Sequence, residues 1–257
     1  MLRSDITISE YTSQTITELT NQGMLFSYAT ARSYITATKV TEGLHARIPI
    51  ITYNGAVIVE NGTGRILKKN SFSEAQKQEL FEGLLAGGVC PIVYAYRAEK
   101  EVFAYLWEQC SEATKDFLQT RQGDVRETPV ESVEDLIQGE VFYFTCIDSY
   151  EKLEPLYHQF RDKYHCAFCK DIYSGEQWLE IMPAHVSKAN ALAQLKAYLG
   201  VDYVVAFGDG KNDMEMFEFA DEAYAMANAV EELKAIATGV IGSNDEDGVA
   251  RWLAERI

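Results

Sequence analysis

Two carboxylates stand four residues apart in the glycine-containing loop at residues 208–213. Asp209 and Asp213 follow an apolar run at residues 203–207, which predicts a strand, and precede a segment that predicts a helix. In an open parallel sheet, ligands bind beyond the carboxyl ends of the strands, so both side chains are expected to reach one crevice. Carboxylate oxygens are the ligands that Mg²⁺ prefers, and the loop therefore predicts a magnesium site.

Two nucleotide-binding patterns do not fit this loop. A P-loop requires glycine and Ser/Thr at positions where this chain has Val205 and Asn212. The dinucleotide-binding pattern requires a third glycine where Asp213 stands. A structural alternative stays open, in which Asp213 caps the helix that follows.

Thr30 and Lys188 are candidates for binding an anion. Thr30 ends an apolar run at residues 24–30, where its hydroxyl and the following N–H groups could accept a phosphate at a helix N-terminus. Lys188 stands in the first turn of a predicted helix, where a cation opposes the helix dipole unless an anionic partner offsets it. A strand-end threonine and a solvated surface lysine are the ordinary alternatives. A shared site is favoured because all of these residues fall at or just after the carboxyl ends of predicted strands.

The elements that would position these residues follow a βα rhythm at both ends of the chain. Ser9 is expected to cap a first helix, and apolar runs at residues 24–30 and 49–53 flank a second, which indicates a parallel sheet. In the middle of the chain, two-faced strands alternate with polar helices, which indicates an inserted α+β domain. The predicted organisation is an α/β core at residues 1–56 and 184–257, with a cap domain inserted at residues 57–183.

Composition limits the class of protein. Among 257 residues, 47% are hydrophobic and 24% charged, which excludes disorder as the main state. A formal net charge of -16 disfavours nucleic acid and anionic membrane surfaces as partners. The sequence has no uninterrupted apolar stretch of about 18 residues and no apolar core of a secretory signal, so we expect a cytoplasmic protein. The five cysteines do not predict a disulfide framework, and Cys166 and Cys169 should face opposite sides of a strand.

Several segments, in their order along the chain, resemble the Cof-type sugar-phosphatase branch of the haloacid dehalogenase-like hydrolases. The resemblance runs from about Leu2 to the C-terminus. The segments that carry it are Ala29-Thr-Ala-Arg32, Thr52-Tyr-Asn-Gly55, Leu179-Glu-Ile-Met-Pro183 with Val186-Ser-Lys188, Ala206-Phe-Gly-Asp-Gly-Lys-Asn-Asp-Met-Glu-Met216, Ala225-Met-Ala-Asn-Ala229 and Ser243-Asn-Asp-Glu-Asp-Gly-Val249.

The resemblance implies a Rossmann-like core with an α/β cap and Mg²⁺-dependent hydrolysis of small phosphate esters such as sugar phosphates. By carry-over, Thr30 and Lys188 would be the catalytic residues that hold phosphoryl oxygens, and Lys188 would also neutralise a nucleophilic carboxylate. Asp209 and Asp213 would serve the metal. The residues that would contact a small phosphorylated metabolite are Thr30, Arg32, Asn54, Lys188 and Asn212.

The chain departs from the family pattern at its amino end. The family opens with an apolar strand ending in Asp-x-Asp-Gly-Thr-Leu-Leu, whose aspartates are implied to act as nucleophile and as general acid and base. The segment Met1-Leu-Arg-Ser-Asp5 resembles the stretch after that motif, so we expect both carboxylates to be absent. No apolar strand precedes Asp5 to deliver it to the sheet edge, and we do not expect it to substitute. Two functions stay open: a shortened, inactive phosphatase, and a non-catalytic protein that binds a phosphorylated metabolite or a partner.

The absent strand should also affect the core. In the family it is central, between the strand ending at Thr30 and the strand ending at Phe207. Because neighbouring strands lie about 4.8 Å apart, its absence leaves a slot of roughly 10 Å that neither edge can bridge by pairing. Either the two flanking strands close up, or another segment or chain fills the slot, or the edges are exposed and invite association. We expect distortion or disorder around residues 1–9, self-association through the unpaired core strands, and only weak Mg²⁺ binding.

Overall fold

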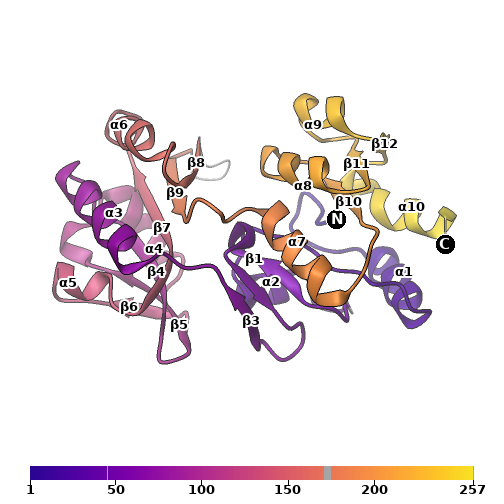
Figure 1. Ribbon diagram of the computed structural model, residues 1–257, viewed down its shortest axis with the longest axis horizontal. Coiled ribbons are helices and arrows are strands. Elements are labelled where there is room, and N and C mark those ends of the chain that lie inside the picture. Colours follow the sequence, from indigo (N-terminus) through magenta and orange to yellow (C-terminus); the bar gives the residue numbers. More distant parts are fainter. Residues whose placement is uncertain (45, 171–174, 257) are drawn as a thin grey trace. The chain divides into compact units, whose positions relative to one another are not determined.

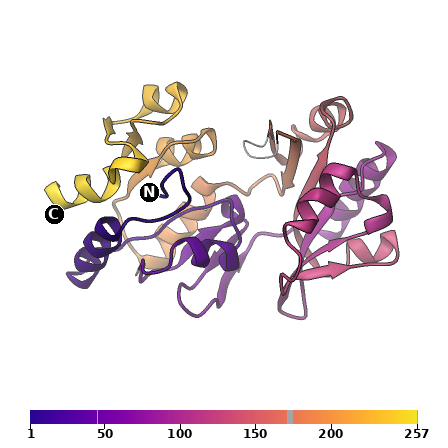
Figure 2. The same ribbon diagram turned by 180° about the vertical axis from the view of Figure 1, so that it is seen from behind.

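The chain folds into two compact units. The computed structural model describes residues 1–44, 46–170 and 175–256. The first unit, here called the core unit, combines the two ends of the chain, Met1–Lys69 and Val186–Ile257. The second, the inserted unit, comprises Asn70–His185. Figures 1 and 2 show the core unit in indigo to purple and orange to yellow, and the inserted unit mainly in magenta.

The core unit contains short strands and six α-helices within the described residues. The helices are α1 (Glu10–Asn21), α2 (Tyr34–Val40), α7 (Lys188–Leu199), α8 (Met214–Phe219), α9 (Glu231–Ile236) and α10 (Gly248–Arg256). The strands are β1 (Ile50–Thr52), β2 (Val57–Val59), β3 (Ile66–Lys69), β10 (Val205–Gly208), β11 (Glu222–Met226) and β12 (Gly239–Ile241).

The strands of the core unit form two separate sheets. One is parallel, in the order β10-β11-β12, and the other is antiparallel, in the order β1-β2-β3. The predicted strand at residues 24–30 contributes only a parallel bridge between Ala29 and Ile51. The α/β class with a parallel sheet is therefore confirmed, but the sheet is interrupted.

A cavity of about 800 Å³ is lined by residues 24–30, by β10 and by Met1 and Leu2. Apolar side chains of α7 and α10 also line it, among them Leu192 and Trp252. Within the described residues, β10 pairs with β11 alone and is an edge strand. Within the described residues the two flanking runs do not pair with each other, so closure of the slot, one of the expected alternatives, is not what the structure shows.

The first nine residues form a turn that is fastened to the loop before α10. The Ile6 backbone has a φ of 66°, a left-handed conformation that is unfavourable for a β-branched residue, so the expected distortion is present. Asp247 accepts hydrogen bonds from the side chains of Arg3 (2.9 Å to its Oδ2), Ser9 (2.6 Å) and Thr12 (3.1 Å). These bonds fix the start of α1 against the start of α10.

The inserted unit is built on one six-stranded sheet, in the order β6-β5-β4-β7-β9-β8. Two helices, α3 and α6, contribute to a hydrophobic cluster on one face, whereas α4 packs with a smaller cluster on the other. Its strands are β4 (Ile92–Arg97), β5 (Lys100–Tyr105), β6 (Glu127–Pro129), β7 (Glu140–Asp148), β8 (His165–Lys170) and β9 (Gln177–Met182). Its helices are α3 (Glu74–Ala86), α4 (Glu112–Gln119), α5 (Val133–Leu136) and α6 (Tyr150–Phe160).

The first boundary between the units differs from the predicted one. The insertion was expected from Val57, but residues 57–69 belong to the core unit. The reason is a hairpin: Asn54 and Gly55 take left-handed φ angles of 52° and 108°, and Thr52 then pairs with Val57. An Asn-Gly pair flanked by apolar residues is a strong hairpin signal, and here it extends the core by two strands.

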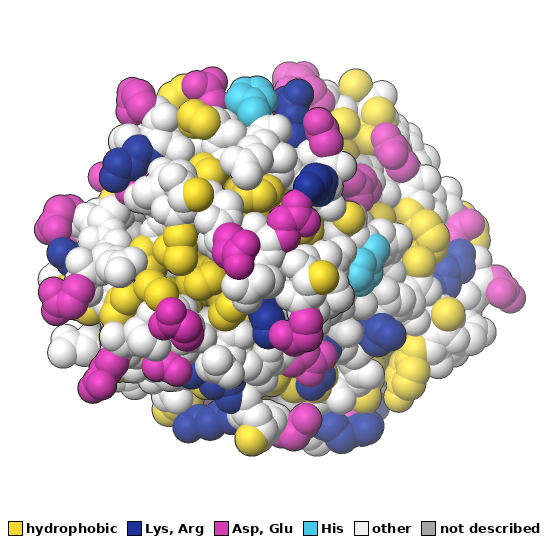
Figure 3. Space-filling view, turned by 60° about the vertical axis from the view of Figure 1, so that its left-hand side comes forward, with side chains coloured by type: hydrophobic (Ala, Val, Ile, Leu, Met, Phe, Trp, Pro, Cys, Tyr) yellow, Lys and Arg dark blue, Asp and Glu magenta, His cyan; other side chains and the backbone are white. Residues whose placement is uncertain are grey.

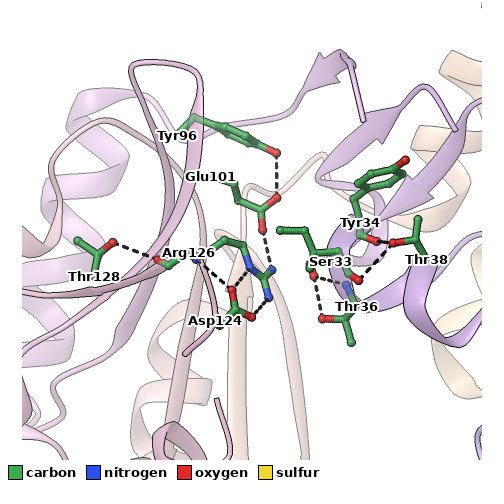
Figure 4. A network of polar contacts seen from close by, with 10 residues as sticks. Ser33, Tyr34, Thr36, Thr38, Tyr96, Glu101, Asp124, Arg126 and Thr128 are labelled. Atoms are coloured by element: carbon green, nitrogen blue, oxygen red, sulfur yellow. Dashed lines mark hydrogen bonds and ion pairs between the residues drawn. The ribbon is translucent and has the colours of Figure 1, made fainter. Parts of the chain in front are cut away.

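A buried arginine organises one side of the inserted unit. Arg126 is 5% exposed and donates to Asp124 (2.7 Å) and Glu101 (2.7 Å), as Figure 4 shows. Pairing with two carboxylates offsets the cost of burying the guanidinium. In the core unit, Figure 4 shows Ser33 at the N-terminus of α2, where its hydroxyl accepts the N–H of Thr36.

The two cysteines of β8, the distribution of surface charge and the character of the helices can each be compared with the sequence analysis. Cys166 packs against the cluster of the inserted unit and Cys169 is exposed, so the two thiols do face opposite sides of β8. In Figure 3, Lys and Arg side chains lie interspersed with Asp and Glu side chains on the face drawn. Among the described helices, none combines the length and the apolar character that crossing a bilayer requires.

Candidate active site at the carboxyl ends of the core strands

A buried ion pair joins α7 to the loop after β10. The Nζ of Lys188 lies 2.7 Å from Asp213 Oδ1, and the two side chains are only 8% and 7% exposed. Lys188 is the first residue of α7, whose N-cap Ser187 accepts the N–H of Asn190. Asp213 is the anionic partner that the position of Lys188 in a first helical turn requires.

Asp213 also holds the loop at residues 208–213 closed. Its Oδ2 accepts the backbone N–H groups of Asp209 (3.0 Å) and Gly210 (3.1 Å). A Cβ at Gly208 would lie 2.7 Å from the Asp213 carboxylate, so this close return of the loop needs glycine. Asp213 does stand at the N-cap position of α8, as the structural alternative predicted, but its side chain makes no capping bond to that helix and accepts the N–H groups of its own loop.

Asp209 is the exposed carboxylate of the pair. Its Oδ2 accepts one long hydrogen bond, 3.4 Å, from Asn228 Nδ2, and its backbone carbonyl accepts the N–H of Val230. Asn228 in turn accepts the N–H of Asn244, whose side chain donates to the Leu2 carbonyl. Sequence reasoning gave Asn228 no role, although its position two residues past β11, in a segment that carries the family resemblance, was an available signal.

Asn54 and Asn212 bring the β1–β2 turn to the same place. Asn212 Nδ2 donates to Asn54 Oδ1 at 3.2 Å, and the Asn54 N–H donates to the Thr30 carbonyl at 3.0 Å. The turn packs closely on the start of α7, because a Cβ at Gly55 would lie 2.2 Å from the Ser187 carbonyl oxygen. Two loops that are far apart in sequence are thereby fixed beside Lys188.

Thr30 and Arg32 are the remaining two of the residues predicted for the site. Thr30 Oγ1 accepts the N–H of Arg32 at 3.1 Å, and within the described residues its hydroxyl hydrogen has no acceptor. Both residues line the 800 Å³ cavity together with Lys188, Asp209 and Asp213. The structure thus brings all seven predicted residues to one edge of the core unit.

The donor set can be compared with what Mg²⁺ requires. No group of three His, Cys, Asp or Glu side chains suited to a metal ion occurs among the described residues. Asp213 has both oxygens committed, which leaves the exposed Asp209 as the available carboxylate. This fits an ion that keeps most of its waters and takes one or two carboxylates, and it does not fit a cage made by protein alone.

The described residues supply no further aspartate in this cavity. Asp209 and Asp213 are the aspartates among the residues that line it. Asp5 accepts the hydroxyl (2.6 Å) and N–H (3.0 Å) of Thr7, and these bonds lower the pKa of Asp5 below its ordinary value. It therefore belongs to the N-terminal turn, as its sequence context indicated.

The chain does contain one Asp-x-Asp-Gly sequence, at Asp245 and Asp247, and it has a structural role. Asp245 accepts the Ser4 N–H and hydroxyl, whereas Asp247 binds Arg3, Ser9 and Thr12. Burial alone would raise the pKa of Asp247, but the three donors outweigh it and lower that pKa. The pair fastens the N-terminal turn and does not reach the cavity lining.

Fold and site together define a class: an α/β protein with an inserted α+β unit, whose polar site lies at the carboxyl ends of parallel strands. A family model described as haloacid dehalogenase-like hydrolase matches residues 1–253, and the chain belongs to that family. It is 27% identical to a Bacillus subtilis protein named 5-amino-6-(5-phospho-D-ribitylamino)uracil phosphatase YitU, over 99% of this chain and 93% of that one.

Solved structures agree with this assignment. The chain resembles TM0651 from Thermotoga maritima with a TM-score of 0.80 and 26% identity, over 100% of this chain and 93% of that one. It also shares the fold of a haloacid dehalogenase-like hydrolase from Bacteroides thetaiotaomicron, with a TM-score of 0.77 and 22% identity, over 99% of this chain and 95% of that one.

Proposed function

We propose that this chain binds small phosphorylated metabolites, with Mg²⁺, at the site around Lys188, and that the described residues do not turn them over. The lineage chemistry is hydrolysis of phosphate monoesters through a phosphoaspartate, as the family implies. The buried Lys188–Asp213 pair beside Thr30 and Asp209 is the observation that carries the proposal.

Lys188 is suited to hold a phosphoryl group. An ammonium has three donors, and one is used by Asp213, so two remain for phosphoryl oxygens. The low exposure of the pair keeps the charge weakly screened and fixed in place. Thr30, which lines the same cavity, can add its hydroxyl donor, and Arg32 a guanidinium.

Asp209 would hold the Mg²⁺, which supplies charge stabilisation to the phosphoryl oxygens when it is bound. Asn228 orients the Asp209 carboxylate through its amide. The hydrogen bond from Asn212 to Asn54 joins the loop at residues 208–213 to the β1–β2 turn and so holds both beside Lys188.

Binding without turnover follows from the carboxylates that are present. In-line displacement at phosphorus through a covalent intermediate needs a positioned nucleophile as well as charge stabilisation. Asp213 is committed to Lys188 and to two N–H groups, and Asp209 would be taken up by the Mg²⁺, so neither would be free to attack.

Calorimetric titration of orthophosphate in the presence of Mg²⁺ tests the binding. Lys188→Ala should weaken binding by roughly 10- to 100-fold, since a hydrogen bond to a charged group contributes about 1.5–3 kcal/mol. The matched control is Lys211→Ala in the same loop, whose lysine is exposed and paired with Glu232. Equal binding by both variants would contradict the site.

Turnover is tested with an aryl phosphate and Mg²⁺. We expect no phosphate release by this chain. Release that Asp209→Ala and Lys188→Ala both abolish would show that a nucleophile is present and would refute the inactive assignment.

Two forms of this proposal stay open: a shortened, inactive phosphatase, and a protein whose natural function is non-catalytic binding of a phosphorylated metabolite or a partner. The genomic sequence upstream of the Met1 codon separates the two. An in-frame apolar run ending in Asp-x-Asp-Gly-Thr-Leu supports a shortened phosphatase, and a stop codon supports the binding protein.

A further inference from the structure

Two helices of the inserted unit, α3 and α5, line a groove of about 430 Å³. The residues that α3 contributes recur at spacings of three and four from Glu74 to Leu85, so they form one stripe along nearly the whole helix. At 1.5 Å per residue this stripe is roughly 16 Å long. The groove therefore follows the axis of α3, a shape that suits a stretch of polypeptide better than a compact small molecule.

The wall that α5 supplies is held in place by the rest of the inserted unit. A helix of one turn is not stable by itself, so its position depends on its fastenings. The Arg97 guanidinium donates to the carbonyls of Asp135 (2.6 Å) and Gln138 (3.2 Å). From the side of α3, the Nζ of Lys77 donates to the Gly139 carbonyl at 3.4 Å. The groove is therefore preformed, and a partner would bind without the entropic cost of ordering this wall.

The floor of the groove is apolar. Phe81 of α3 and Ile137, just past α5, are buried members of the hydrophobic cluster of the inserted unit. Leu85 and Val133 are half-buried and pack against the same cluster. An apolar side chain seated in the groove would extend this cluster and lose its own contact with water.

The charged residues of the groove are mainly acidic. Three glutamates line it, Glu74, Glu82 and Glu134, together with one lysine, Lys77. Lys77 is only 8% exposed and pairs with Glu74 at 2.7 Å, so these two charges compensate each other. Glu82 and Glu134 are exposed, and neither makes an ion pair with any residue that the structure describes. Two carboxylates are therefore left to attract a cationic partner.

We propose that the groove between α3 and α5 binds a cationic amphipathic helix of a partner protein. Apolar side chains spaced three and four residues apart would lie over Phe81, Leu85 and Val133, and flanking Lys or Arg side chains would pair with Glu82 and Glu134. The groove is small for a protein interface, so the complex is expected to be weak and transient. The proposal concerns the inserted unit alone and does not rest on the proposed function.

A second copy of this chain is a poorer occupant of the groove. A net charge of -16 opposes the close approach of two copies. Among the described helices, none carries more than two Lys or Arg residues, and one of the two in α7 is the buried Lys188. The cationic helix is therefore expected to come from another protein.

The first test is the fluorescence anisotropy of labelled helical peptides titrated with the full chain. The parent peptide has leucines at positions i, i+3, i+4 and i+7 and lysines beside them. One control peptide replaces the lysines with glutamates, and another keeps the composition but distributes the leucines around the helix. The parent should bind saturably, and more weakly as the salt concentration rises. No saturable binding, or equal binding by either control, would overturn the proposal.

Charge-exchange variants locate the binding on the protein. The pair Glu82→Lys and Glu134→Lys should weaken binding of the parent peptide by about tenfold or more, and should allow the glutamate peptide to bind. An unfolded variant could not produce that gain. The matched control pair is Glu151→Lys and Glu218→Lys, at two exposed glutamates outside the groove, and should change binding by less than about twofold. Equal losses in the two pairs would contradict the proposal.

Sedimentation of the chain without peptide tests the other occupant. Self-association that Glu82→Lys and Glu134→Lys abolish would show that a second copy fills the groove, and would overturn the proposal. Binding of orthophosphate is measured separately on the same variants and should not change. Its loss in the unaltered chain would refute the proposed function and leave the groove proposal standing.

Discussion

Replacing Asp213 should destabilise the core unit more than any other single change at the site. Its carboxylate faces Lys188 at 2.7 Å in a region where both side chains are less than a tenth exposed. Removing one partner of a buried ion pair costs about 3–5 kcal/mol, because the remaining charge is left uncompensated. Asp213→Ala also leaves two backbone N–H groups without an acceptor, each costing about 1–3 kcal/mol in a buried setting, although these costs do not simply add.

Two variants separate these contributions. Asp213→Asn keeps an oxygen that can accept the N–H groups of Asp209 and Gly210 but removes the charge that offsets Lys188. We expect it to cost less than Asp213→Ala, and to cost still less when Lys188→Met is present, because no buried ammonium then lacks a partner. Asp209→Ala is the matched control; its side chain is exposed, so the change should stay within about 0.5 kcal/mol.

The measurement is urea unfolding combined with hydrogen exchange of the α7 and β10 amides. Exchange is needed because two compact units need not unfold as one, and it reports the core unit by itself. A loss below about 1 kcal/mol for Asp213→Ala would refute the argument from burial and pairing. So would an Asp209→Ala variant as unstable as Asp213→Ala.

Four other predictions concern the rest of the molecule. Gly55→Ala should cost several kcal/mol in thermal unfolding, because its Cβ would lie 2.2 Å from a carbonyl oxygen. The control Gly62→Ala has a similar positive φ but open space around the Cβ, and should cost only about 1 kcal/mol. Equal losses of stability in the two variants would contradict the steric argument. Asp247 has a lowered pKa in the folded chain, so its contribution is present above its ordinary value of 3.8 and is lost as pH falls through the folded pKa. Urea unfolding should therefore show stability falling below about pH 4, with a smaller fall in Asp247→Asn. A maleimide should label the exposed Cys169 in the native protein but not the buried Cys146, because burial strongly raises the pKa of the Cys146 thiol. Mass spectrometry of the adducts measures the labelling of each cysteine, and early labelling of Cys146 would contradict the prediction. Self-association through the β10 edge stays a prediction, and sedimentation over a range of concentrations should reveal it; a chain that stays monomeric throughout would count against it.

Local signals at the ends of elements were the most predictive part of the sequence. Ser9 caps α1 as expected, and Ser187 caps α7 in the same way, because a serine before an apolar-periodic segment satisfies a free helical N–H whatever surrounds it. The loop with Asp209 and Asp213 was likewise found from its own residues. Such features depend on a few neighbouring positions.

Features set by distant neighbours were less predictable. The apolar run at residues 24–30 has the composition of a strand, yet it makes a single bridge because only one side has a partner. The hairpin after Asn54 extends the core unit where a cap was expected. The part played by Asp247 depends on a residue more than 230 positions away, which no local pattern can indicate.

Asp213 has two structural roles, and together they have an evolutionary consequence. A carboxylate that compensates a buried ammonium and closes its own loop is needed for folding, whether or not any ester is ever cleaved. Selection for a folded chain would therefore retain aspartate at this position among relatives that have lost catalysis. Invariance at Asp213 in a set of related sequences thus diagnoses an intact scaffold, and enzymatic competence has to be judged from a carboxylate with no such structural task.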